Sequence, residues 1–321
     1  MNKTVILLLF ILSNVLAACS GAANAKTATD FEAPISNQTE LHQDGNHDDH
    51  DHSHIDPATA TAEMRVVLVP SELVVGPNRF AVGLFDPNGN MIYEGAVHFH
   101  YFDLNDPKAP QLESEADATR LQTPDGLTSI FAHERTFTRP GEWGVEVQAH
   151  LPDGTTAIKR IRFQVLADSP SLKPGDLAPI LETPTMADVN GDLGQLTSAL
   201  EPNLALHQLS LAEALANGKP TVLLFATPAF CQTRFCGPAY DIVSEVQEAY
   251  GDAVNFVQVE VYTGLPNPTA NNWAMAPAMA AFGLQTEPWL FLIDREGTIV
   301  HRVEGLVTVQ EIEAHLQEIG D

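Results

Sequence analysis

The chain has 321 residues, and its 42 acidic against 16 basic side chains give a formal charge of −26 at neutral pH. Binding to nucleic-acid phosphates needs a basic surface, so this charge argues against nucleic acid as a partner. The same charge favours solubility and can concentrate cations near the protein. The length predicts about two domains.

The first 18 residues have the features of a signal peptide. Lys3 precedes an apolar run over residues 5–12, and small residues precede Cys19. The run is shorter than the roughly 20 apolar residues that span a bilayer. Its end, Leu-Ala-Ala-Cys, resembles the lipobox of bacterial lipoproteins, which implies that Cys19 is lipidated and begins the mature chain. An ordinary secretory signal is the alternative. We therefore expect a lipoprotein attached to the cell membrane on its extracytoplasmic face, periplasmic or extracellular.

Residues 19–61 are small and polar, and they contain too few large apolar side chains to form a core. We expect a disordered tether. Within it, the segment HQDGNHDDHDHSHID alternates histidine with aspartate. Imidazole binds copper and zinc, so the segment is a possible site for either metal. A solvated acidic spacer is the alternative. The predicted metal ligands are His47, His50, His52 and His54.

Residues 62–167 predict an all-β, immunoglobulin-like sandwich. Short runs rich in Val, Ile and Phe are separated by the turn segments DPNGN, RPGEW and LPDGT. This spacing is typical of a β-sandwich. The segment GPNRFAVGLFDPNGNMI resembles exported YtkA-like domains. His98 and His100 lie two residues apart on one predicted strand and therefore share a face. They could bind a metal together with His133 or His150. The alternative is that they are ordinary polar residues on the outer face of the sandwich.

Residues 168–190 are rich in proline and predict a linker. From residue 191 to 321 the pattern alternates between helix and strand. The predicted elements are a helix capped by Ser210 and Glu213, a buried strand over 221–226, a helix over 237–252, a strand over 253–262, a short helix over 277–284, a hairpin over 288–305 and a helix over 308–320.

Cys231 and Cys236 lie between the buried strand and the following helix. Two residues five apart on a regular helix are about 7.5 Å apart along its axis, which exceeds the roughly 7 Å that a disulfide allows between Cα atoms. Pro238 indicates the start of the helix, because proline is favoured at the first helical position. We therefore expect Cys231 in the loop and Cys236 at or just before the helix N-terminus, where the dipole would lower its pKa.

This arrangement resembles the thioredoxin superfamily, in particular its membrane-anchored thiol-disulfide oxidoreductases. The segments PGDLAPILETPT, GKPTVLLFATPAFC and TEPWLFLID carry the resemblance, which covers residues 172–321. It implies an α/β thioredoxin-like fold, a mixed sheet flanked by helices. It also implies catalysis by Cys231 and Cys236 beside a cis-proline at Pro288. The partners would be thiols or disulfides of exported proteins or a redox partner protein, and no cofactor would be required.

The sequence departs from the family in two ways. Four residues separate the cysteines instead of two, and Leu224 occupies the position of a buried acid. The segment CGP at Cys236 also allows that cysteine to be the attacking thiol, although the alignment that starts at Cys231 is favoured.

Two alternatives to catalysis remain. The pair could bind copper, as in Sco-type delivery proteins, which the chain also resembles in its widely spaced cysteines. Alternatively, it could form a structural disulfide in a non-catalytic interaction domain.

Overall fold

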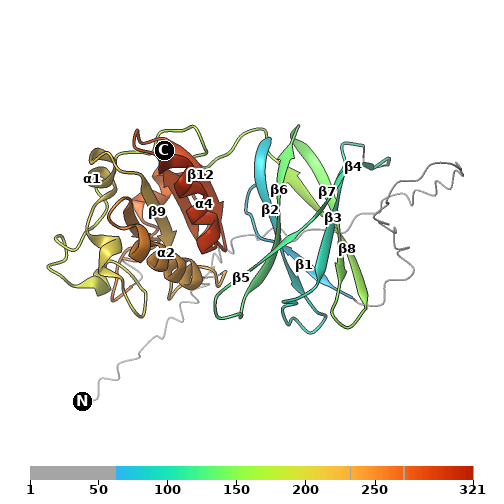
Figure 1. Cartoon of the computed structure of the whole chain (residues 1–321), viewed down its shortest axis with the longest axis horizontal. Coiled ribbons are helices and arrows are strands. Elements are labelled where there is room, and N and C mark those ends of the chain that lie inside the picture. Colours follow the sequence, from blue (N-terminus) through green and yellow to red (C-terminus); the bar gives the residue numbers. More distant parts are fainter. Residues whose placement is uncertain (1–62, 107, 232, 270–271, 321) are drawn as a thin grey trace, which may run out of the picture.

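A computed structural model shows a β-sandwich and an α/β domain in contact with one another (Figure 1). The structure describes residues 63–106, 108–231, 233–269 and 272–320. The predicted signal peptide, Cys19 and the tether with His47, His50, His52 and His54 lie outside these residues. Among the helices described, none combines the length and the apolar composition that crossing a membrane requires.

Two four-stranded antiparallel sheets form the N-terminal domain, which confirms the predicted sandwich. Their strand orders are β1-β2-β6-β5 and β4-β3-β7-β8. The strands are β1 (Arg65–Leu68), β2 (Gly76–Phe85), β3 (Ala96–Asp103), β4 (Gln111–Asp117), β5 (Thr119–Gln122), β6 (Ser129–Phe137), β7 (Gly141–His150) and β8 (Thr156–Val165).

An aromatic core fills the space between the two sheets. On β3, Phe99 and Tyr101 point inward, and the ring of Phe80 on β2 lies 5.3 Å from each of them. Because side chains alternate along a strand, His98 and His100, which alternate with these two rings, lie on the outer face. Burial of this inner face against the second sheet holds the sandwich together.

The strands β4 and β5 are not among the segments predicted from apolar alternation. Strand β4 reads QLESEAD, and most of its residues are exposed. Within the described residues it forms the edge of its sheet, where it pairs with β3. A polar edge strand has no buried face to produce a hydrophobic pattern, and charge there protects the edge from pairing with other chains.

The C-terminal domain follows the predicted order of helices and strands. Its elements are the short 3-10 helices η2 (Leu193–Gln195) and η3 (Leu204–His207), then α1 (Leu211–Ala216), β9 (Thr221–Ala226), α2 (Cys236–Tyr250), β10 (Asn255–Glu260), α3 (Pro277–Ala281), β11 (Trp289–Ile293), β12 (Ile299–Glu304) and α4 (Val309–Gly320). The sheet order is β10-β9-β11-β12, with β10 parallel and β11 antiparallel to the central β9. Ser210 and Glu213 form the predicted capping box of α1.

The sheet of this domain is covered on both faces. Strand β9 is buried along its whole length, and alternate residues face opposite sides. Val222 and Leu224 pack in a cluster with α2 and α4, whereas Leu223 and Phe225 pack in a cluster with α1 and α3. This two-sided burial explains the continuous apolar run of β9.

The segment expected to be a linker, residues 168–190, runs along the C-terminal domain. The backbone N–H of Leu172 donates to the carbonyl of Phe282 at 3.0 Å, and that of Ala178 donates to the carbonyl of Gly297 at 2.9 Å. Gly283 has φ +73°, and a Cβ there would lie 2.2 Å from the carbonyl oxygen of Pro170. Glycine at this position therefore allows the segment to approach closely.

The outer face of the sheet β1-β2-β6-β5 contacts the C-terminal domain, and we call this contact the domain interface. Its apolar centre consists of Val69, Ala81, Leu121, Ile130, Ala132, Phe235 and Leu306. Ion pairs also cross the boundary. Arg79 Nε lies 3.1 Å from Glu311 Oε1, and Arg302 Nη2 lies 2.8 Å from Glu72 Oε1. All four side chains are largely buried, so loss of one partner would leave a buried charge.

Candidate redox site

Both cysteines lie where β9 leads into α2. The backbone N–H of Phe230 donates to the carbonyl of Thr227 and turns the chain after the strand. Helix α2 begins at Cys236, two residues before Pro238. Proline is tolerated at Pro238 because the first backbone N–H groups of a helix have no intrahelical partner. Cys231 is therefore in the loop and Cys236 is the first helical residue.

The two thiols are free and differ in exposure. Cys236 is fully buried, whereas Cys231 is partly exposed. The backbone N–H of Cys236 donates to Cys231 Sγ at 3.3 Å, and Thr233 Oγ1 lies 3.3 Å from the same sulfur. The first backbone N–H of α2 thus points at the Cys231 sulfur, whereas the side chain of Cys236 points into the core.

This geometry separates the acidities of the thiols. The hydrogen bond from the Cys236 thiol, together with those from Thr233 and the Cys236 backbone, lowers the pKa of Cys231 to about 5 despite partial burial. Burial raises the pKa of Cys236, and the hydrogen bond and charge of Cys231 raise it further. The sequence-based expectation placed the lowered pKa on Cys236. The structure places it on Cys231, because burial of the Cys236 side chain outweighs its position on the helix.

Glu287 and Pro288, which directly precede β11, lie beside the two cysteines. The Glu287–Pro288 peptide bond is cis. Thr233 Oγ1 donates to the Glu287 carbonyl at 3.1 Å, which connects this segment to the cysteine loop. One carboxylate oxygen of the buried Glu287 and both cysteine sulfurs all lie within 4.8 Å of one another.

The sequence-based interpretation gave no role to the side chain of Glu287. A signal for its side chain was present, because Glu287 is an ionisable residue immediately before a strand, Trp289–Ile293, that is buried throughout. Leu224 occupies the position where the family has a buried acid, and Glu287, in the loop before β11, places a carboxyl group beside the sulfurs instead.

The β-sandwich contacts both segments of the redox site. Phe235, which directly precedes Cys236, is part of the domain interface. Ser71 Oγ lies 3.2 Å from Oγ1 of Thr286, which directly precedes Glu287. The N-terminal domain therefore forms one side of the surroundings of the cysteines.

The other predicted metal residues are arranged differently from the expectation. His98 and His100 lie together on the outer face of β3, but neither His133 nor His150 joins them in a cluster of possible ligands among the described residues. Their neighbour is Glu115 on β4. His133 lies on β6, in the other sheet, and His150 Nδ1 lies 3.1 Å from the Thr156 hydroxyl.

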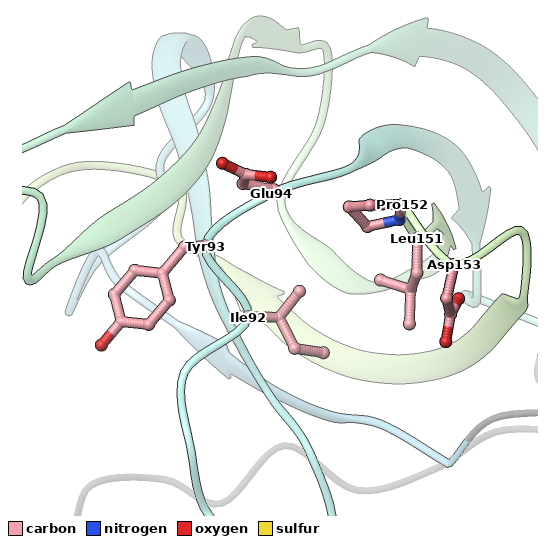
Figure 2. A pocket seen from close by; sticks show the side chains of 6 residues that line it. All are labelled: Ile92, Tyr93, Glu94, Leu151, Pro152 and Asp153. Carbon is pink, nitrogen blue, oxygen red and sulfur yellow. The ribbon is translucent and has the colours of Figure 1, made fainter.

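A hollow on the β-sandwich lies away from the cysteines. Figure 2 shows that its lining contains one aromatic ring and two acidic side chains but neither cysteine nor histidine. The hollow therefore lacks the thiol and imidazole groups of the sites predicted from the sequence. The lining residues are Ile92, Tyr93, Glu94, Leu151, Pro152 and Asp153.

Comparison with known proteins gives a family for the C-terminal part. Residues 207–320 match the model of a family described as a thioredoxin-like domain. A search of curated proteins finds no match to the chain.

Several solved structures are similar to parts of the chain. A putative thiol:disulfide interchange protein DsbE from Chlorobium tepidum is 17% identical over 47% of this chain and 100% of its own, with a TM-score of 0.33. A thio-disulfide isomerase from Thermus thermophilus is 16% identical over 46% and 98%, with a TM-score of 0.29. CopC from Methylosinus trichosporium OB3b is 14% identical over 33% and 97%, with a TM-score of 0.22. The family match agrees with the order and sheet topology of the C-terminal elements, and residues 207–320 form a thioredoxin-like domain.

Proposed function

We propose that this protein is a thiol-disulfide oxidoreductase that uses Cys231 and Cys236 on exported proteins. The unequal acidity of the two thiols carries the proposal. Cys231 is accessible, and its pKa is lowered to about 5, whereas Cys236 is buried and its pKa is raised. An attacking thiol must be a thiolate and reachable, and a resolving thiol must be protected until the mixed disulfide has formed.

The reaction begins with the thiolate of Cys231. It attacks one sulfur of a substrate disulfide, the substrate S–S bond breaks, and the departing sulfur takes a proton. A mixed disulfide then joins Cys231 to the substrate. Loss of the negative charge on Cys231 removes one of the causes that raise the pKa of Cys236. Formation of the mixed disulfide therefore makes Cys236 easier to deprotonate.

The second step needs a base for Cys236. Glu287 is buried, and its carboxylate lies within 4.8 Å of both sulfurs. In this proposal it accepts the Cys236 proton, and the Cys236 thiolate then attacks the Cys231 sulfur. The substrate leaves as a dithiol, two electrons having passed to it from the protein, which becomes the disulfide. A reduced dithiol partner protein must return the pair to its starting state.

The surface beside Cys231 suits a polypeptide substrate. Phe230 is 37% exposed, and its ring lies 4.9 Å from that of Trp273. Trp273 in turn stacks on Tyr262 at 4.4 Å. Exposed aromatic rings provide rigid apolar contact area for a partner chain. The overall negative charge would favour neutral or basic substrate segments.

The N-terminal sequence supports the proposed compartment. In this proposal Cys19 carries the lipid, residues 19–61 tether the folded domains at the extracytoplasmic face, and His47, His50, His52 and His54 bind copper or zinc. The low-pKa thiol is consistent with export, because an oxidising compartment supplies disulfides for it to attack.

The reduction potential of the Cys231–Cys236 pair tests the function. Equilibration with glutathione redox buffers, read by alkylation and mass spectrometry, should give a value above about −300 mV. Disulfide reduction by the dithiol protein should be lost in Cys231→Ser. A potential well below that threshold would identify a structural disulfide and overturn the proposal.

The variant Glu287→Gln separates the two chemical steps. The first attack should proceed at its normal rate, but the mixed disulfide with glutathione should accumulate, because resolution should slow roughly 100-fold, a typical loss when a general base is removed. The matched control is Glu182→Gln on the segment before α1. Unchanged resolution in Glu287→Gln would exclude Glu287 as the base.

Metal delivery is the second candidate function, because Cys231, Cys236 and Glu287 together form a group that could hold an ion. Thiolates favour Cu(I). Delivery predicts that the reduced protein binds one Cu(I) tightly and that Cys231→Ser abolishes this binding, whereas exchange predicts disulfide reduction in the absence of copper. Because only two soft ligands are present beside a carboxylate, thiol–disulfide exchange is the better supported function.

A further inference from the structure

We propose that the β-sandwich carries a divalent metal site formed by His98, His100 and Glu115, suited to zinc or copper(II). This site is separate from the cysteines. It lies on the outer face of the sheet β4-β3-β7-β8, whereas the domain interface is formed by the other sheet. Figure 1 shows β3, β7 and β8 on the side of the sandwich that faces away from the C-terminal domain.

Strand register brings the three ligands together. His100 on β3 is directly opposite Glu115 on β4, and His98 is directly opposite Asp117. Glu115 Oε2 lies 3.3 Å from His100 Nε2 and 3.9 Å from His98 Nε2. Tetrahedral ligands at about 2.0–2.1 Å from zinc lie about 3.3–3.4 Å from one another. The His100–Glu115 spacing of 3.3 Å matches this value and the His98–Glu115 spacing of 3.9 Å is larger, so an ion could enter once side-chain adjustments bring His98 closer.

The second nitrogen of each imidazole faces another carboxylate. His98 Nδ1 lies 2.8 Å from Asp117 Oδ1, and His100 Nδ1 lies 3.5 Å from Glu146 Oε1. A histidine that donates its Nδ1 proton to a carboxylate, as His98 can to Asp117, keeps a lone pair on Nε2, and metal-binding histidines are commonly oriented by such carboxylates. Both Nε2 atoms then face the same oxygen of Glu115.

The carboxylate behind His100 is itself fixed. Glu146 is 7% exposed and accepts hydrogen bonds from Arg160 Nε at 2.6 Å and Gln148 Nε2 at 2.8 Å. The site is therefore rigid on its buried side. On the other side the side chain of Glu115 is 46% exposed, which leaves a path for an ion and room for a fourth ligand from solvent.

The donor set defines the class of ion. Two imidazoles and one carboxylate suit borderline divalent ions such as Zn²⁺ and Cu²⁺, whereas Cu(I) prefers sulfur and Ca²⁺ and Mg²⁺ prefer oxygen alone. Without an ion, the same side chains would form only a network of polar contacts between histidines and carboxylates. These two interpretations predict different responses to zinc.

Zinc titration of the full chain tests the site. The tract histidines His42, His47, His50, His52 and His54 are changed to Asn, and the cysteines are kept oxidised so that neither group competes. This background protein should bind one equivalent of Zn²⁺. Glu115→Gln and His100→Asn should each weaken the affinity at least tenfold, and Asp117→Asn should weaken it about 10- to 100-fold as an orienting residue.

The matched control is His150→Asn, which changes an exposed histidine on β7 of the same sheet and should leave zinc binding unchanged. Glu115→Gln keeps the test informative even if His100→Asn does not fold, because Glu115 is on an exposed edge strand. With Cu²⁺ as the probe, the electron paramagnetic resonance spectrum should show two imidazole nitrogens, and one after His98→Asn. Absence of stoichiometric zinc binding in the background protein, or equal affinity in Glu115→Gln, would overturn the proposal.

Discussion

The acidity of Cys231 depends on a single neighbouring side chain more than on the helix. The largest influence on its pKa is the hydrogen bond from the Cys236 thiol, which lowers it. Burial comes next and raises the pKa, and the hydrogen bond with the Thr233 hydroxyl then lowers it again. The chemical identity of residue 236 therefore controls the reactivity of residue 231. Serine keeps a donor at this position, whereas alanine removes it.

We predict that the rate of Cys231 alkylation by iodoacetamide in Cys236→Ser rises with pH through a midpoint near 5. The thiolate is the reactive form, so the rate follows its population, which increases as the pH passes the pKa. In Cys236→Ala the midpoint should move upward, toward the ordinary cysteine value of about 8.5. Mass spectrometry of the Cys231 peptide across pH 4–9 measures both. Equal midpoints in the two variants would show that the Cys236 side chain has no such effect.

At the level of elements, the short helix η3 contains a buried histidine without a polar partner. His207 is 1% exposed, and neither ring nitrogen has a hydrogen-bond partner within the described part of the chain. Burial lowers its pKa from 6.5 to about 4. Between these values the unfolded chain binds a proton that the folded protein does not, so stability falls as the pH decreases from 6.5 to 4.

We predict that His207→Leu reduces this loss of stability by up to about 3 kcal/mol over that pH window. Urea unfolding at pH 7 and pH 4.5, followed by circular dichroism, measures the difference for each protein. Carboxylates contribute to acid sensitivity in all variants. The quantity to compare is therefore the change in unfolding free energy between the two pH values in each variant. The control is His150→Leu, which replaces an exposed histidine and should behave like the wild type. The same change in His207→Leu as in the wild type would contradict the buried neutral imidazole.

Elements with a buried face were predictable from the sequence, and those without one were not. The run Thr221–Ala226 and the capping box at Ser210 are local signals, and both describe the structure correctly. Strand β4 is polar and exposed, so nothing in its pattern marked it as a strand, and the neighbours of His98 and His100 could not be identified without its register.

The candidate redox site was only partly predictable for a similar reason. The position of the cysteines between β9 and α2 follows from sequence spacing, and Pro288 was located through the family resemblance. The direction of the Cys236 side chain and the approach of the Glu287 carboxylate depend on tertiary packing. Those two features decide which thiol is acidic and which group lies beside both.

At the scale of the whole molecule, the β-sandwich supports the redox site through the domain interface. Ala81 on β2 is 1% exposed and shares a cluster with Phe235, the residue before Cys236. Val67 on β1 belongs to the same sheet but is 44% exposed. Introducing arginine at these two positions compares a buried contact with an open one on the same sheet.

We predict that in Ala81→Arg the two domains unfold at different temperatures, whereas in Val67→Arg they still unfold together. A buried unpaired charge costs several kcal/mol, roughly 2–5 by analogy with broken buried pairs, and the domains can avoid this cost by moving apart. Calorimetry should then show two unfolding transitions instead of one. Because Phe235 would lose its packing, the loop should relax and the pH midpoint for alkylation of Cys231 should rise. A single transition together with an unchanged midpoint in Ala81→Arg would show that the sandwich neither stabilises the thioredoxin-like domain nor shapes its cysteine loop.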